Sequence, residues 1–103
     1  MDGPDERILK CLDRALDTLG QSVKRVTYFY LAKEEGLVPK DLIRKPGRFL
    51  DGLHNFFGTG ADIIENWIIR ELRKEAYLSI RESGNLLEAI ENAKRKLAGK
   101  AFC

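Results

Sequence analysis

Glycine and proline residues divide this chain at short intervals, and these divisions limit what it can fold into. They fall near positions 3–4, 20, 36, 39, 46–47, 58–60, 84 and 99. Between them, apolar side chains recur at spacings of three and four, which is the pattern of amphipathic helices, and no segment alternates strictly as an exposed strand does. The sequence therefore predicts an all-α fold.

The helical segments can be placed from this punctuation. Five helices are predicted over residues 4–19, 22–35, 46–57, 60–81 and 85–98, with the one over 60–81 the longest and a short helical turn over 39–43. The residues expected to cap helix N-termini are Asp2, Ser22, Thr59 and either Asn85 or Ser83. Short connections between the segments favour a compact bundle or an orthogonal array of about five helices.

The segment over 22–35 admits a second interpretation. Its β-branched and aromatic run over 26–31 would also suit a buried strand. We favour a helix, because charged flanks extend the pattern to helix length and no second strand is available for pairing. The expected core face consists of Val23, Val26, Phe29 and Tyr30, and Tyr28 and Leu31 widen it.

The composition suits one small domain covering residues 1–103. Hydrophobic residues make up 44% and charged residues 33% of the 103 positions, which provides one core and is too apolar for a disordered chain. A core of this size leaves no room for a large enclosed ligand cavity. The formal net charge of +2 is lower than a dedicated nucleic-acid-binding domain usually carries.

Cysteine usage and hydropathy indicate a cytoplasmic protein. Cys11 and Cys103 are the two cysteines, and neither belongs to a CxxC pair. We expect Cys11 to be a buried thiol without chemistry. No apolar run approaches the roughly 20 residues that span a membrane, and the acidic N-terminus lacks the apolar segment of a signal peptide, so no membrane partner is expected.

Residues for catalysis or metal binding are sparse. The single histidine, His54, has no HxxxH or ExxH partner, so we expect no metal site. There is no GxSxG motif, and a thiol–imidazole pair would need Cys11 or Cys103 to reach His54. The acids over 65–82 are interleaved with bases, as on an ion-paired, solvated helix face. The sequence therefore predicts a non-enzymatic protein without a cofactor.

Surplus apolar width on the helices suggests a protein-binding surface. Single stripes cannot bury every large side chain of the second, third and fourth segments. Either a helix lies at the centre of the fold, surrounded on all sides, or a surface is left for self-association. The residues expected at such an interface are Tyr28, Leu31, Ile63 and Trp67.

Two basic stretches offer an alternative, a surface for nucleic acid. One holds Lys40, Arg44, Lys45 and Arg48, and the other holds Lys94, Arg95, Lys96 and Lys100. Brought together by the fold, they would bind phosphates in a salt-dependent way. The three residues of the second stretch at 94–96 would equally offset the dipole at a helix C-terminus.

The Gly58-Thr59-Gly60 segment is a candidate anion nest. Glycines permit close backbone approach, and free N–H groups at a helix start attract anions. The segment matches neither GxGxxG nor a P-loop. A tight corner between two helices, with Gly58 ending one and Thr59 capping the next, is the favoured interpretation.

Residues 19–75 resemble a small archaeal helical domain, the Nitrosopumilus output domain type. The resemblance lies in Tyr28-Phe29-Tyr30-Leu31, Pro46 with Phe49 and Leu53, Phe57-Gly58, Gly60-Ala61, and Ile64-Glu65 with Ile68 and Leu72. It implies a role downstream of a sensor and no catalytic residue. The leading hypothesis is therefore an interaction or signalling output module that forms a homodimer, and the alternative is a small nucleic-acid-binding regulator.

Overall fold

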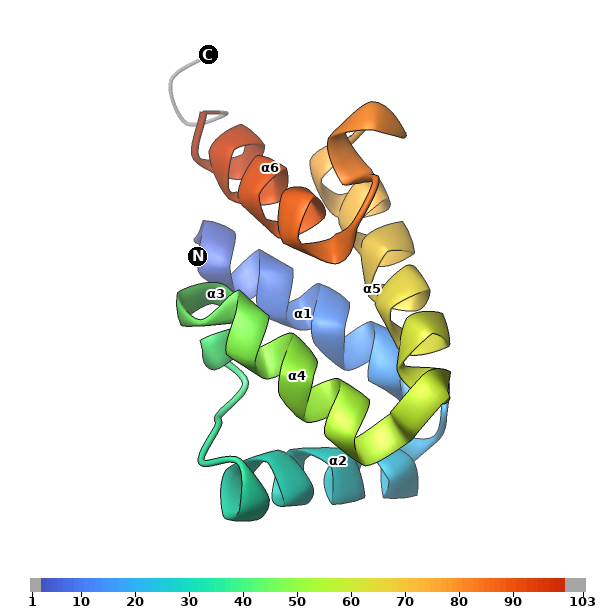
Figure 1. Ribbon diagram of the computed structural model, residues 1–103. Helices are drawn as coiled ribbons and strands as arrows, with labels where there is room; N and C mark the ends of the chain where they lie inside the picture. Colours follow the sequence, from blue (N-terminus) through green and yellow to red (C-terminus); the bar gives the residue numbers. More distant parts are fainter. Residues whose placement is uncertain (1–2, 100–103) are drawn as a thin grey trace.

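The computed structural model describes residues 3–99, and within that range every regular element is helical (Figure 1). The elements are α1 (Pro4–Asp17), α2 (Gln21–Glu34), α3 (Asp41–Arg44), α4 (Pro46–Phe57), the 3₁₀ turn η1 (Gly58–Gly60), α5 (Ala61–Ala76), the 3₁₀ turn η2 (Arg81–Ser83) and α6 (Leu86–Gly99). The all-α prediction with five main helices is confirmed. The run over 26–31 lies inside α2, so the strand interpretation is wrong.

Helix α1 organises the core. It crosses the middle of the molecule, with α5 and α6 packed on it and α2 across its C-terminal end (Figure 1). Its inward stripe is fully buried and consists of Ile8, Cys11, Leu12, Ala15 and Leu16. Proline at the first position of α1, followed by Asp5 and Glu6, suits the positive end of the helix dipole. The N-cap expected at Asp2 lies outside the described residues.

Helix α2 packs on α1 and α4 through a narrow inner face. Leu31 is 1% exposed, and Thr27 is buried with its hydroxyl donating to the Val23 carbonyl at 2.7 Å. The opposing residue on α4 is Gly52, where an added Cβ would lie 2.7 Å from Leu31 Cδ2. The lack of a side chain at Gly52 therefore sets how closely α2 and α4 approach.

Two of the predicted N-caps are wrong and one is confirmed. Gly20 precedes α2 with a φ of 101°, so the helix begins at Gln21 and Ser22 lies within its first turn. Gly58 ends α4 with a φ of 61°, and Thr59 belongs to the following 3₁₀ turn. Asn85 does cap α6, since its Oδ1 accepts the Glu88 N–H at 2.9 Å.

The longest helix ends earlier than predicted. Helix α5 stops at Ala76, because Tyr77 adopts a left-handed φ of 56° and the Leu78 N–H bonds back to the Arg73 carbonyl at 3.2 Å. A capping box then starts η2: the Glu82 N–H donates to Ser79 Oγ at 3.2 Å, and the Ser79 N–H donates to Glu82 Oε1 at 2.9 Å. This Ser-x-x-Glu pattern is readable in the sequence and explains the break.

Ion pairs join α5 to α1 across the core boundary. Arg7 Nε lies 2.6 Å from Glu75 Oε2, and Arg14 lies 3.4 Å from Glu71 and 3.6 Å from Glu75. The hydrogen bond from Arg7 lowers the pKa of the Glu75 carboxyl. The acids of α5 therefore pair mainly between helices, whereas the sequence suggested pairs along one helix.

The expected buried thiol is confirmed. Cys11 is 0% exposed, and burial raises its pKa to about 12. None of the helices among residues 3–99 has the length and apolar character needed to cross a bilayer.

Candidate interaction surface

The outward side of α2 carries large apolar side chains in contact with solvent. Phe29 is 65% exposed and Val26, almost one turn earlier, is 53% exposed. Arg25, Ala32 and Lys33 share this side and are also exposed. These five residues form what we term the outer α2 face. Lys33 Nζ lies 5.6 Å from the centre of the Phe29 ring, within cation–π range.

The position of α2 in the fold explains this exposure. The helix lies along one edge of the molecule and packs on α1 and α4 from one side (Figure 1). It is therefore not the surrounded central helix that would bury apolar residues on all sides. Part of the apolar width predicted for this segment is therefore left in solvent, where neighbouring apolar side chains rimmed by polar residues are candidates for contact with another protein.

The rotation of α2 about its axis differs from the predicted one: of the predicted core face, Val23 and Tyr30 are half-buried and Tyr30 packs against the core, but the other two residues are exposed. Leu31, predicted at the interface, is 1% exposed and packs over Gly52, so it is not part of any surface. Val26 and Phe29, predicted on the core face, point to solvent. The sequence does indicate that Phe29 faces solvent, because Arg25 and Lys33 lie one turn before and after it on the same side of the helix. Charged side chains rarely face a core.

The other predicted interface residues do not meet at one place. Tyr28 is half-buried, and its hydroxyl donates to Asp13 Oδ1 at 3.2 Å, which ties α2 to α1. Trp67 is half-buried against the core. Ile63 is 56% exposed and lies on α5, four residues before Trp67. The predicted interface is therefore divided between α2 and α5, and Ile63 alone of its four residues is exposed.

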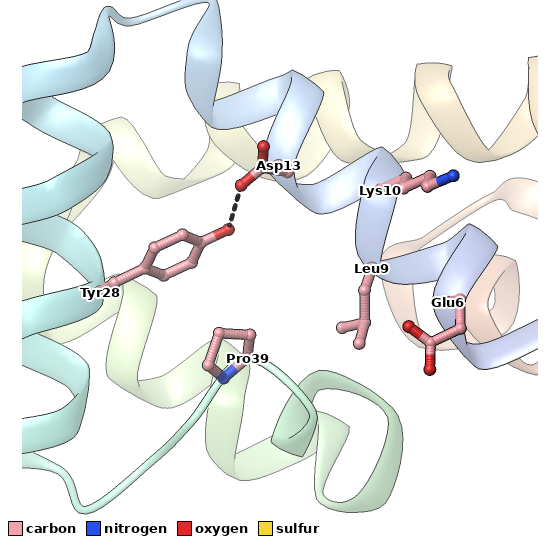
Figure 2. A pocket seen from close by; sticks show the side chains of 6 residues that line it. All are labelled: Glu6, Leu9, Lys10, Asp13, Tyr28 and Pro39. Carbon is pink, nitrogen blue, oxygen red and sulfur yellow. Dashed lines mark hydrogen bonds between the residues drawn. The ribbon is translucent and has the colours of Figure 1, made fainter. Parts of the chain in front are cut away.

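An open hollow lies beside Tyr28, between α1, α2 and the segment before α3 (Figure 2). Its volume is about 280 Å³, and it is lined by Glu6, Leu9, Lys10, Asp13, Tyr28 and Pro39. Ligand pockets usually run from about 300 to 1,000 Å³ and enclose most of the ligand. Its small size, its openness and the Tyr28–Asp13 hydrogen bond across it make this hollow a poor small-molecule site.

The fold brings the two basic stretches together at one point. Lys94 of α6 donates to the Ile43 carbonyl of α3 at 2.9 Å, which places α6 beside the first stretch. Lys40, Arg44 and Lys45 are exposed and have no acidic partner among residues 3–99.

Two of the remaining bases in these stretches are engaged in contacts with other parts of the protein. Arg48 donates to the Glu35 carbonyl at 3.0 Å. Lys96 turns toward η2, where it pairs with Glu82 Oε1 at 2.9 Å. Arg95 is exposed on α6, and Lys100 lies outside the described residues. Three bases near α3 therefore remain as the centre of any polyanion site.

The glycine segment forms a tight corner. Gly58, Thr59 and Gly60 make one 3₁₀ turn between α4 and α5, and the Gly58 N–H is already bonded to the His54 carbonyl. Asp62 follows in the first turn of α5, so a carboxylate stands where an anion would approach. The corner geometry accounts for all three residues and is unfavourable for an anion nest.

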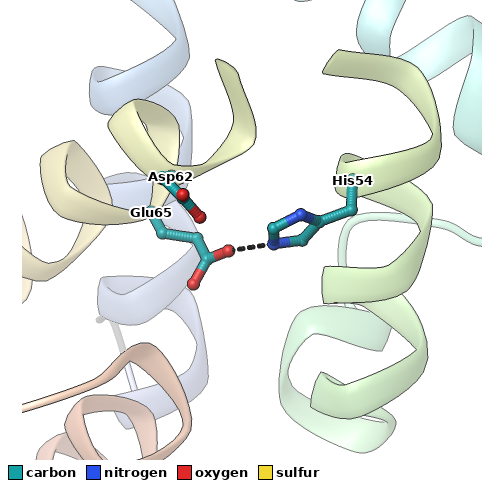
Figure 3. Close-up of side chains that lie close together, drawn as sticks. All are labelled: His54, Asp62 and Glu65. Carbon is teal, nitrogen blue, oxygen red and sulfur yellow. Dashed lines mark hydrogen bonds and ion pairs between the residues drawn. The ribbon is translucent and has the colours of Figure 1, made fainter. Parts of the chain in front are cut away.

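The corner also brings together a cluster that the sequence did not indicate. His54 of α4 faces Asp62 and Glu65 of α5, and Glu65 accepts a hydrogen bond from His54 Nε2 (Figure 3). One donor atom from each of the three side chains lies within 4.8 Å of the others. His54 and Asp62 are exposed and Glu65 is half-buried.

Comparisons with known proteins add no family to these observations. No protein-family model, no curated protein and no solved structure matches the chain. The resemblance to the Nitrosopumilus output domain type therefore stays a prediction.

Proposed function

We propose that this protein is a non-enzymatic interaction module whose outer α2 face binds an acidic, apolar helix of a partner protein. The observation that carries the proposal is the exposure of Phe29 and Val26, 65% and 53%, between two exposed cations. Aromatic and basic side chains on one helix face are typical anchors for an amphipathic helix. A role downstream of a sensor would use this face to contact the next protein.

Charge selects the partner. The outer α2 face holds Arg25 and Lys33 and no carboxylate, while Lys24, on the other side, is neutralised by Asp13 and Asp17 at 3.0 and 2.7 Å. Carboxylates on the partner would lie beside Arg25 and Lys33, whereas a basic partner would be repelled.

The same charges disfavour a homodimer built on this face. An antiparallel pairing of two α2 helices centred on Phe29 places Arg25 of one copy opposite Lys33 of the other, because both lie four residues from the centre. Like charges in direct opposition cost energy at low salt, when screening is weakest. We therefore propose another protein as the partner, in place of the second copy that the sequence suggested.

The area available implies a weak, reversible contact. Helix α2 has 14 residues, and at 1.5 Å per residue it is about 21 Å long. One helix face of that length buries less than the roughly 1,200 Å² of a small stable interface. Binding in the micromolar range or weaker is the expectation.

The experiment is an NMR titration of the ¹⁵N-labelled chain with a synthetic amphipathic peptide that carries leucines on one side and glutamates beside them. We expect amide shifts to change at Arg25, Val26, Phe29 and Lys33 and not on α6. A control peptide with lysine in place of every glutamate should produce no change. Equal shifts with both peptides, or shifts elsewhere, would overturn the proposal.

A second candidate function, polyanion binding, rests on the Lys94–Ile43 contact that joins the two basic stretches. We propose Lys40, Arg44 and Lys45 as its centre. About three to four phosphate contacts predict a log–log salt slope near −3 for duplex DNA. Fluorescence anisotropy against a labelled duplex tests this, with Lys45→Glu expected to weaken binding. A slope near zero would rule it out.

A further inference from the structure

We propose that His54, Asp62 and Glu65 form a binding site for a divalent transition-metal ion, with Zn²⁺ as the best-fitting common ion. The site would link the last turns of α4 to the first turns of α5 across the glycine corner (Figure 3). It is independent of the outer α2 face, which lies on another helix.

The geometry needs little rearrangement. Ligand atoms around a tetrahedral Zn²⁺ lie about 2.0–2.2 Å from the ion, which separates them from one another by about 3.5 Å. The three donor atoms here already lie within 4.8 Å of one another. His54 and Asp62 are exposed, so their side chains can turn the remaining distance without disturbing the core.

The two helices hold the donors in a fixed relation. Asp62 and Glu65 are three residues apart on α5 and therefore share one face of it. His54 is three residues before the end of α4, and the Gly58–Gly60 turn brings that end against α5. His54 and Glu65 are already in contact, so the site forms without folding of a new element.

The donor set selects the kind of ion. One imidazole nitrogen and two carboxylate oxygens suit Zn²⁺, Co²⁺ and Ni²⁺, and Cu²⁺ binds such sets more tightly still. Mg²⁺ and Ca²⁺ prefer oxygen donors alone, so they would gain little from His54. Water would complete the coordination, because three protein donors converge among residues 3–99.

The local charge favours a cation. Residues three or four positions from the three ligands within α4 and α5 include no lysine or arginine, and they include one further acid, Asp51. The N-terminal dipole of α5 opposes a cation with about half a positive charge. The two carboxylates of Asp62 and Glu65 outweigh this partial charge.

The test uses the fact that His54 is the only histidine in the chain. Imidazole nitrogen signals in a long-range ¹H–¹⁵N spectrum therefore report on one residue. The Cys103→Ser variant is used throughout, so that the terminal thiol cannot bind the probe. On addition of ZnCl₂ we expect the His54 signals to shift with one ion per chain, and the midpoint of thermal unfolding to rise.

Matched carboxylate variants decide between a site and general attraction of cations. Glu65→Gln and Asp62→Asn should each weaken Zn²⁺ binding at least about tenfold, since even outer-shell partners of metal ligands are worth 10–100-fold. Asp51→Asn removes the same charge one turn from His54 and should leave affinity unchanged within about twofold. Unshifted imidazole signals, or equal weakening by all three variants, would overturn the proposal.

Discussion

Replacing Gly52 by alanine tests the packing of α2 on α4, which fixes the rotation of α2 and so exposes Phe29. Two terms of opposite sign compete. Alanine is favoured over glycine inside a helix by about 1 kcal/mol. The new Cβ would lie 2.7 Å from Leu31 Cδ2 and 3.3 Å from Leu37 Cδ1, and both leucines are 1% exposed. Overpacking in such a closed region costs about 1–3 kcal/mol.

The expected net result is a loss of about 1 kcal/mol in the free energy of unfolding, taking the middle of the overpacking range. Gly47 supplies the control on the same helix, because nothing lies within 4 Å of a Cβ added there. Gly47→Ala should stabilise by about 0.5 kcal/mol. Urea unfolding followed by circular dichroism measures both. If Gly52→Ala were as stabilising as Gly47→Ala, α2 would not lie against α4 as described.

Three further predictions concern the end of α5, the ion pair between Arg7 and Glu75, and the buried thiol of Cys11. Tyr77→Val should be less stable than Tyr77→Gly by at least about 1 kcal/mol, because a β-branched residue is strained at a φ of 56° and glycine is not. Thermal unfolding compares the two variants. The pKa of Glu75 is lowered by Arg7, so its stabilisation is complete above the unfolded value of about 4.3 and is lost as pH falls through the lower folded value. Urea midpoints against pH should therefore fall on the acid side, and Arg7→Gln should flatten that fall; an unchanged profile would contradict the pairing. Cys11, with its pKa raised to about 12, should react with a thiol reagent only as fast as the chain unfolds, and a rapid reaction in the Cys103→Ser variant would contradict its burial.

The helix content could be predicted from the sequence because glycine and proline act locally. A positive φ at Gly20 precedes the start of α2, and a positive φ at Gly58 ends α4, whatever surrounds these glycines. The helix predicted over 60–81 is too long, although the sequence contains a local indication of its end, the Ser79–Glu82 capping box. The prediction followed the apolar periodicity, which continues past this point. The predicted caps at Ser22 and Thr59 are wrong because a glycine, two positions before Ser22 and one position before Thr59, sets the start of each element.

The candidate sites depended on tertiary placement and could not be predicted in the same way. Helix α2 carries apolar residues on two of its own sides, so their spacing alone does not show whether Phe29 or Leu31 is the buried residue. Leu31 is the buried residue because Gly52, which lies on α4, leaves room for its side chain. The cluster at His54 needs the corner to fold α4 against α5, which no motif within one helix can indicate.

The most direct test of the proposed interaction is the Kd of the acidic peptide for the chain and for two serine variants. Burying a Phe side chain contributes about 1.5–3 kcal/mol, so Phe29→Ser should raise the Kd by about 10- to 100-fold. Leu87→Ser removes a side chain that is 46% exposed on α6 and should leave the Kd unchanged. An unchanged Kd for Phe29→Ser, or an equal rise for both variants, would contradict binding at the outer α2 face.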